Sequence, residues 1–174
     1  MRIGLYGGAF NPPHIGHLKV AAHAMVMGGL DSVWFLPAFH HAFGKEMAPF
    51  EDRLEMVRRL VGTGPGTRVL NHAVGQPFER DFGTTYTVDL VEKLVGMPFH
   101  EFVLILGPDQ MATIDKWHRW DDLKKLVEIM VVPECGPERS TKIREAIRAG
   151  DTATVEAMAP PAVRAWFMDK KLYL

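Results

Sequence analysis

Short apolar runs alternate along the chain with longer segments in which apolar side chains recur every three or four positions. A short run of this kind predicts a buried strand, whereas the longer spacing predicts a helix that buries one face. We expect strands at residues 3–6, 32–37, 67–71, 101–106 and 128–132. We expect helices at residues 15–27, 50–61, 84–95, 121–126, 140–149, 155–158 and 162–169. Thr84 or Thr85 would cap the third of these helices, and Ser140 the fifth.

Strands that alternate with helices favour a parallel sheet covered on both faces. We therefore predict an α/β fold, a single Rossmann-like, doubly wound domain over residues 1–174, with about five strands and flanking helices. Ligands of such folds bind beyond the carboxyl ends of the strands. Functional residues should therefore directly follow a strand or begin a helix.

Composition changes this picture little. Hydrophobic residues make up 47% of the chain, charged residues 24%, and the net charge is −1. These values give no reason to expect a nucleic-acid or membrane partner. Cys135 is the one cysteine, which is typical of a reducing compartment, and a strand at residue 3 leaves no room for a signal peptide. We expect a cytoplasmic protein that binds small molecules, and homo-oligomer formation stays open.

The strongest candidate site directly follows the first expected strand. Residues 7–17 read G-G-A-F-N-P-P-H-I-G-H. Glycines let the backbone approach an anionic ligand, and the start of a helix offers unpaired N–H groups. His14 and His17 lie three positions apart, so both can reach one phosphate. Two histidines at this spacing, without the rest of the string, would equally fit a purely structural role. The complete string favours a phosphate site.

Other sites fit the residues less well. The string lacks the G-x-G-x-x-G pattern of dinucleotide-binding folds and the G-K-[ST] ending of a Walker A loop. One cysteine and scattered histidines do not give the spacing of a zinc site, so we predict no metal ligands in the protein.

The string resembles the H-x-G-H signature of the nucleotidyltransferase superfamily. Three further segments resemble the nicotinate (nicotinamide) mononucleotide adenylyltransferase family: T-T-Y-T-V-D at 84–89, the G-x-D-x-M and W-x-x-W pattern at 107–120, and R-S-T-K-I-R at 139–144. Lys45 is the counterpart of the lysine that ends a P-P-H-K loop in the family. The resemblance covers nearly the whole chain, although the lysine loop differs and the link at 133–138 is short.

The resemblance implies a role for each matching residue. The implied catalytic residues are His14, His17, Lys45 and Arg144. The implied ATP contacts are Gly7, Gly8, Ala9, Phe10, His14, His17, Gly107, Asp109, Ser140, Thr141 and Arg144. The implied mononucleotide contacts are Thr85, Tyr86, Asp109 and Trp117. From the residues alone, Asp109 would equally serve as a helix cap, Trp117 as a core residue, and Ser140 with Thr141 as caps.

The implied reaction is adenylyl transfer from ATP, accompanied by Mg²⁺, to nicotinate mononucleotide, which gives deamido-NAD and pyrophosphate. The differences in the lysine loop and the short link leave two alternatives open. One is transfer of an adenylyl or cytidylyl group to another acceptor, such as nicotinamide mononucleotide, phosphopantetheine or a phosphorylated alcohol. The other is a nucleotide-sensing module that binds without turnover.

Overall fold

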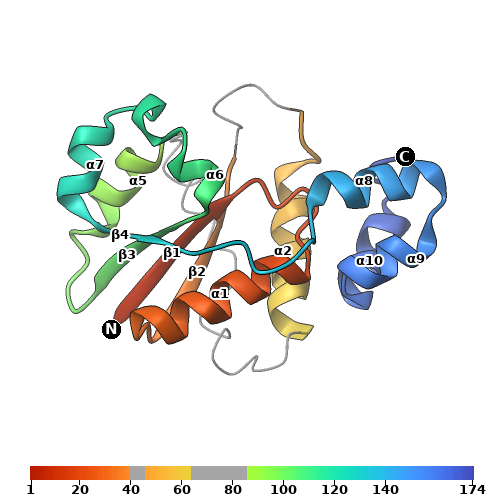
Figure 1. Ribbon diagram of the computed structural model, residues 1–174, viewed down its shortest axis with the longest axis horizontal. Coiled ribbons are helices and arrows are strands. Elements are labelled where there is room, and N and C mark those ends of the chain that lie inside the picture. The colour runs from red at the N-terminus through yellow and green to blue at the C-terminus, as the bar shows by residue number, and fades with distance from the viewer. Residues whose placement is uncertain (40–45, 64–85) are drawn as a thin grey trace.

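A four-stranded parallel sheet lies at the centre of the computed structural model, which describes residues 1–39, 46–63 and 86–174 (Figure 1). The strands of these described residues are β1 (Arg2–Gly8), β2 (Ser32–Pro37), β3 (Glu101–Leu106) and β4 (Glu128–Val131). Their order across the sheet is β2-β1-β3-β4. The chain therefore passes from β1 to β2 on one side and later from β3 to β4 on the other. A crevice between β1 and β3, at their carboxyl ends, is the usual ligand site of such sheets.

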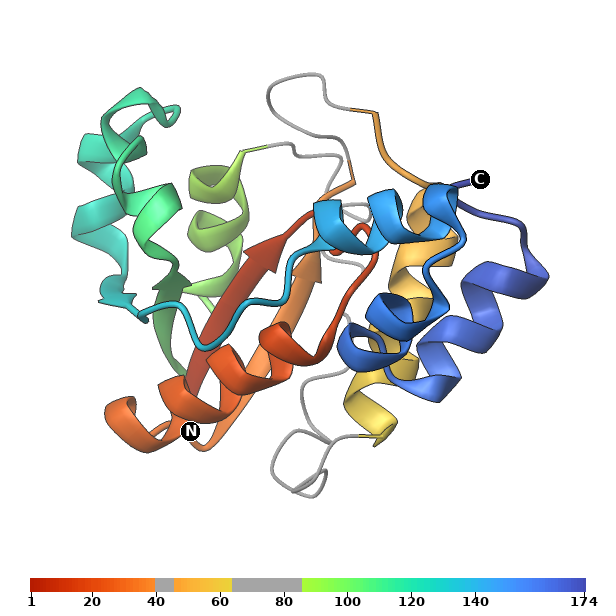
Figure 2. The same cartoon turned by 45° about the vertical axis from the view of Figure 1, so that its right-hand side comes forward.

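Helices cover both faces of the sheet (Figures 1 and 2). The described helices are α1 (Ile15–Gly28), α2 (Phe50–Thr63), α5 (Thr87–Leu94), α6 (Pro108–Met111), α7 (Trp120–Leu126), α8 (Ser140–Ala149), α9 (Thr152–Met158) and α10 (Pro161–Asp169), with a 3₁₀ turn, η1 (Ile114–Lys116). Gly29 and Gly150 end α1 and α8 in the left-handed conformation, which glycine adopts without steric cost.

Alternation of side chains along the strands builds two cores. Leu5 of β1 and Leu104 of β3 pack with α5 and α7 on one face. Val103 and Ile105 of β3 pack on the other face with α1, α2 and the C-terminal helices. Because successive strand residues point to opposite faces, a strand buried on both sides is apolar throughout. This explains why the strands appear in the sequence as continuous apolar runs.

The predicted fold class is confirmed, with small differences in its elements. Four expected strands are present, and the fifth, at 67–71, lies outside the described residues. The described part of α5 begins at Thr87 with Tyr86 in the N-cap position, whereas the expected caps Thr84 and Thr85 lie outside that part. α6 and η1 were not expected, because four and three residues are too few to show helical periodicity. No helix of the described chain is long and apolar enough to cross a membrane.

Candidate active site

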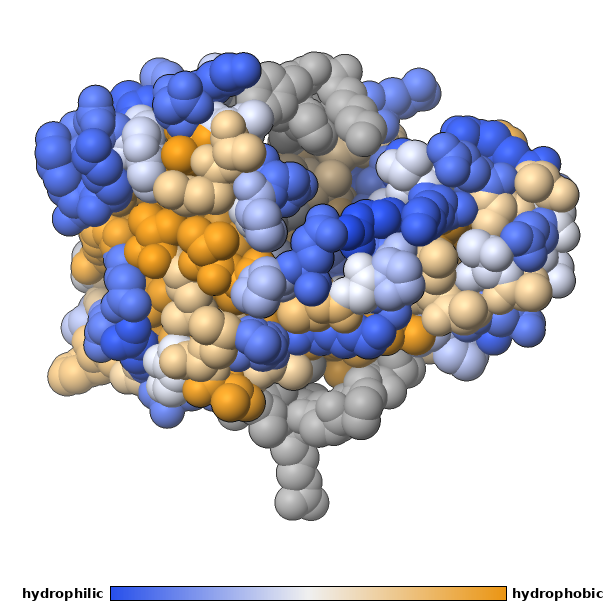
Figure 3. Space-filling model, in the orientation of Figure 1, coloured by the Kyte–Doolittle hydropathy of each residue, from blue (hydrophilic) through white to orange (hydrophobic). Residues whose placement is uncertain are grey.

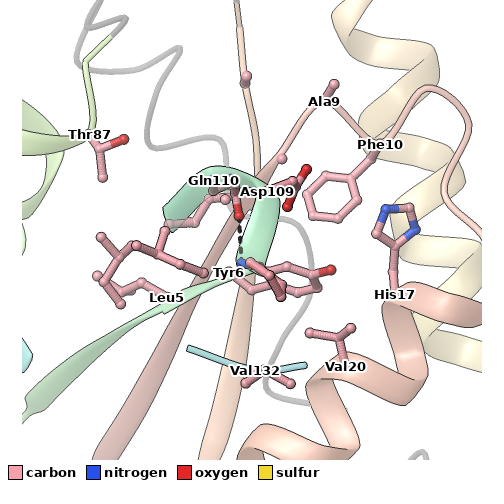
Figure 4. A pocket seen from close by; sticks show the side chains of 18 of the residues that line it. Leu5, Tyr6, Ala9, Phe10, His17, Val20, Thr87, Asp109, Gln110 and Val132 are labelled. Carbon is pink, nitrogen blue, oxygen red and sulfur yellow. Dashed lines mark hydrogen bonds between the residues drawn. The ribbon is translucent and has the colours of Figure 1, made fainter. Parts of the chain in front are cut away.

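A cavity of about 770 Å³ opens at the carboxyl ends of β1 and β3. The surface is hollowed between α6 and α8, where its mouth lies (Figure 3). The predicted site residues that line the cavity are Gly7, Gly8, Ala9, Phe10, His14, His17, Tyr86, Gly107, Asp109 and Trp117. In Figure 4 the side chains of Phe10, His17 and Asp109 border the same space, with Tyr6 below them. The fold thus brings together motifs that are a hundred residues apart in the sequence.

Other predicted residues lie elsewhere. Ser140 donates a hydrogen bond from Oγ to the Pro12 carbonyl (2.8 Å), and Arg144 donates from Nη1 to the Asn11 carbonyl (2.6 Å). Thr141 accepts a hydrogen bond at Oγ1 from Arg144 Nη2 (3.2 Å). Ser140 and Arg144 therefore hold the loop before α1, and all three residues are absent from the cavity lining. Lys45 and Thr85 lie outside the described residues.

The expected cap of α8 is wrong. Arg139 occupies the N-cap position in an extended conformation, and no side chain accepts the capping hydrogen bond. Ser140 is already the first helical residue, and its hydroxyl is engaged by the β1–α1 loop instead of by its own helix. The Ser140 hydroxyl therefore makes a tertiary hydrogen bond to the loop instead of the local capping hydrogen bond that we expected.

The two histidines interact with each other at the start of α1. His14 is the N-cap residue, and its backbone N–H donates to His17 Nδ1 at 3.0 Å. The His17 backbone N–H donates in turn to the His14 carbonyl at 3.0 Å. The ring centroids are 3.7 Å apart. The side chain of His17, the third residue of the helix, thus accepts a hydrogen bond from the backbone of the N-cap residue His14, as in a capping box. This hydrogen bond fixes the orientation of the His17 ring.

Glycine at position 16 is required by the packing of the His14 ring. A Cβ at Gly16 would lie 2.9 Å from His14 Nδ1 and 3.2 Å from Glu138 Cβ. The His14 ring therefore rests on the backbone of Gly16 with Glu138 beside it. This contact gives the H-x-G-H pattern a steric reason.

Burial keeps both histidines neutral. It lowers the pKa of His14 to about 4, with the Glu138 carboxylate opposing this shift and the Arg139 guanidinium adding to it. Burial also lowers the pKa of His17 well below its usual value, and the positive charges of Arg139 and of any protonated His14 add to this shift. Because His17 Nδ1 accepts a hydrogen bond, the proton of the neutral ring is on Nε2. His17 can therefore donate one hydrogen bond to a phosphate oxygen.

Glu138 and Lys19 form an ion pair behind His14. Glu138 is 8% exposed, and its Oε1 accepts a hydrogen bond from Lys19 Nζ at 2.5 Å. Burial opposes ionisation of Glu138, but the hydrogen bond and charge of Lys19 outweigh it and lower the pKa of the carboxyl. The carboxylate is therefore ionised at neutral pH, close to a neutral histidine.

A buried arginine holds the loops around the site. Arg53 of α2 is 1% exposed and donates hydrogen bonds to the carbonyls of Ala48 (2.8 Å), Ala9 (2.9 Å) and Phe39 (3.4 Å). Ala9 follows β1 and Phe39 follows β2, so one guanidinium connects the carboxyl ends of two strands. Phe10, with a positive φ of 47°, directly follows Ala9, whose carbonyl Arg53 binds.

The end of the cavity away from the two histidines is lined by aromatic side chains. The ring of Tyr86 stacks on that of His118 with centroids 4.2 Å apart and planes 30° apart, and Trp117 is beside them in the lining. Gln110 accepts a hydrogen bond at Oε1 from the Gly107 backbone N–H (3.0 Å), which is the dashed line in Figure 4. This geometry suits a flat ring that stacks on aromatic side chains.

Sequence reasoning missed several lining residues. They are Gln110, Lys116, His118, Glu134, Glu138 and Arg139. Gln110, Lys116, His118 and Arg139 lie within the segments that the sequence singled out, and Glu134 and Glu138 lie in the short link at 133–138, so membership of these segments was the available signal. The described residues contain no group of three His, Cys, Asp or Glu side chains arranged to hold a metal ion.

The buried His14 predicts a pH-dependent stability. In the folded chain its pKa is about 4, whereas in the unfolded chain it returns to about 6.5. Between these values only the unfolded chain binds the proton, so stability is fully present above pH 6.5 and is lost as the pH falls towards 4. We expect His14 to reduce the free energy of unfolding by about 2 kcal/mol between pH 7 and pH 5.

Urea unfolding at the two pH values measures this effect. His14→Asn should reduce the dependence by the share of His14 and leave that of the buried His17, whereas His23→Asn, at an exposed position of α1, should retain all of it. Equal pH dependence in the wild type and His14→Asn would contradict the buried, neutral state of His14.

Known proteins match the chain over most of its length. A sequence profile of the cytidylyltransferase-like family matches residues 5–155. A relative from Anaeromyxobacter dehalogenans, named "Probable nicotinate-nucleotide adenylyltransferase", is 37% identical over 98% of this chain and 96% of its own. A relative of the same name from Salinibacter ruber is 34% identical over 99% of this chain and 98% of its own.

Solved structures share the fold. The nicotinic acid mononucleotide adenylyltransferase of Plasmodium falciparum, complexed with NaAD, superposes with a TM-score of 0.82 at 16% identity. The superposition covers 99% of this chain and 97% of that one. At this identity the likeness supports the architecture alone.

Proposed function

The chain belongs to the cytidylyltransferase-like family and is a nucleotidyltransferase, and we propose that it transfers the adenylyl group of ATP to nicotinate mononucleotide. The observation that carries this proposal is the pair His14 and His17, locked at the start of α1 inside a cavity of about 770 Å³. The names of the relatives supply the identity of the acceptor. The products would be deamido-NAD and pyrophosphate, and we expect the reaction to take place in the cytoplasm.

The chemistry needs positioning more than an activated nucleophile. An oxygen of the mononucleotide 5′-phosphate attacks the α-phosphorus of ATP, a P–O bond forms, and the bond to the bridging oxygen of the β-phosphate breaks. Pyrophosphate leaves with that electron pair. Nucleophile and leaving group are both phosphate oxygens at neutral pH, so no general base is required. Binding both substrates in line, with donors aimed at the α-phosphate, supplies the rate enhancement.

The histidines would act on the α-phosphate. The Nε2–H of His17 is the donor that we assign to a non-bridging oxygen, where negative charge increases in the transition state. Phe10 packs against the His17 ring with centroids 4.9 Å apart and supports its orientation. Gly7, Gly8 and Ala9 would offer backbone groups to the nucleotide.

The acceptor would occupy the aromatic end of the cavity. Tyr86 and Trp117, which line the cavity, would stack on or border a pyridine ring. Asp109 would accept hydrogen bonds from a ribose. Thr85 would complete the carboxylate contact that the resemblance implies.

The β- and γ-phosphates of ATP, which leave as pyrophosphate, would be bound by Lys45 and Arg144. Lys45 would neutralise the leaving pyrophosphate, as the resemblance implies. Arg144 donates to the Asn11 carbonyl and to the Thr141 hydroxyl, and Ser140 donates to the Pro12 carbonyl. Arg144 is outside the cavity lining, and we assign to it the same role as Lys45 once ATP is bound. Mg²⁺ would enter with ATP as part of the substrate, held by phosphates and water.

A pyrophosphate-release assay with ATP and a panel of acceptors tests the proposal. We expect a higher kcat/KM for nicotinate mononucleotide than for nicotinamide mononucleotide. The reason is that the backbone N–H groups at the start of α5 would favour the carboxylate of the nicotinate ring. Phosphopantetheine should give no release. A higher kcat/KM for the amide would reassign the acceptor, and ATP binding without release from any acceptor would indicate a nucleotide-sensing module.

A further inference from the structure

Few cations line the described cavity. Its charged side chains, apart from the histidines, are Asp109, Lys116, Glu134, Glu138 and Arg139, with three carboxylates and two cations among them. A bound triphosphate adds several negative charges to this set. Lys116 is beside Trp117 at the aromatic end, which leaves Arg139 as the cation that the described lining provides near the histidines.

The Arg139 guanidinium is fixed by its own loop. Nη1 donates to the carbonyls of Gly136 (2.9 Å) and Glu138 (2.7 Å), which uses both of its N–H bonds. Its charge acts on the two histidines: burial is the main reason why their pKa values are lowered, and Arg139 contributes to both shifts. The guanidinium is therefore a positioned charge beside the place where the α-phosphate would bind.

Part of the guanidinium remains available. Arginine has five N–H donors, and three of them are accounted for by the two carbonyls and by the Glu134 carboxylate at Nη2. Within the described part of the chain, Nε–H and the second N–H of Nη2 have no recorded partner. The edge formed by Nε and Nη2 is the fork that binds two oxygens of one phosphate.

Glu134 contacts Nη2, one of the two nitrogens of this edge, and so presents a carboxylate of the protein where a phosphate oxygen would bind. Its side chain is 58% exposed and that of Arg139 is 41% exposed. An ion pair this open to solvent is weak and is readily exchanged for a more highly charged group. Glu134 also lines the cavity, so its carboxylate and a bound phosphate would lie close to the same guanidinium.

We propose that Arg139 binds the phosphate groups of ATP and that the Glu134 carboxylate competes with them for its guanidinium. The inference rests on the proposed function, because it takes ATP as the ligand of this cavity. It assigns the two residues opposite effects: Arg139 strengthens nucleotide binding and Glu134 weakens it. Neither residue was singled out as a ligand contact by the sequence.

Calorimetric titration of ATP-Mg²⁺, and separately of nicotinate mononucleotide, tests the proposal. Arg139→Ala should raise the Kd for ATP about 10- to 100-fold and change that for the mononucleotide less, and Arg139→Lys should recover part of the loss. Glu134→Gln should lower the Kd for ATP about two- to fivefold at low ionic strength. In an Arg139→Ala background, Glu134→Gln should have no effect on ATP binding.

The controls separate this proposal from the proposed function. Arg2→Ala removes an arginine with two carboxylate partners at the amino end of β1 and should leave both affinities unchanged. A wild-type chain that turns over substrate while Arg139→Ala keeps its ATP affinity would overturn the inference alone. Weaker ATP binding by Glu134→Gln would also overturn it. A wild-type chain that binds no ATP would overturn the proposed function and this inference together.

Discussion

Replacement of His17 by alanine is expected to lower kcat by roughly two to four powers of ten, which is the cost of removing one donor that stabilises charge in a transition state. The Nε2–H of His17 is that donor, and its ring is held by the hydrogen bond from the His14 backbone to Nδ1. Loss of this capping bond should reduce the free energy of unfolding by about 1 kcal/mol, so the variant should remain folded. Pyrophosphate release under saturating substrates measures the effect on kcat.

His23→Ala is the matched control, because His23 is an exposed residue of the same helix outside the cavity lining. It should retain the kcat of the wild type. Near-full turnover of His17→Ala would remove this histidine from the chemistry, whatever the result for His23.

Replacement of Arg53 by methionine is expected to have the largest effect on stability, about 3–5 kcal/mol in the free energy of unfolding. The side chain is 1% exposed, and its removal leaves the carbonyls of Ala9, Phe39 and Ala48 without this donor. Because Ala9 lines the cavity, we also expect a higher KM for ATP in the fraction that remains folded. Urea unfolding and steady-state kinetics measure the two effects.

Arg58→Met is the matched control on the same helix, with a side chain that is 48% exposed. It should reduce the free energy of unfolding by less than about 1 kcal/mol, as is usual for a surface position. A similar small change for Arg53→Met would show that the buried guanidinium does not anchor the loops.

The sequence predicted the fold well where burial determines the pattern. The run at 102–106 is apolar because this part of β3 is covered on both faces, and residues 140–149 are followed by a glycine that terminates α8. α6 escaped prediction because its four residues depend on the turn after β3, a tertiary feature. The local sequence pattern therefore predicts the long helices and strands. It does not predict the short helices, because these depend on the packing around them.

The site was predictable as far as local sequence encodes it. The H-x-G-H string placed His14 and His17 at the start of a helix, as the structure has them. It could not show that burial makes both rings neutral, nor that Ser140 bonds to a loop 128 residues away. Arg139 was missed for the same reason, because its approach to the histidines depends on how the segment before α8 crosses the cavity.

Adenylyl transfer itself is tested most directly by following the α-phosphate. The purified chain is incubated with Mg²⁺, nicotinate mononucleotide and ATP labelled at the α-phosphorus, and the products are separated. We predict that the label appears in deamido-NAD, in an amount equal to the unlabelled pyrophosphate released. Label that stays in ATP, or that appears in free AMP without a dinucleotide product, would contradict the account.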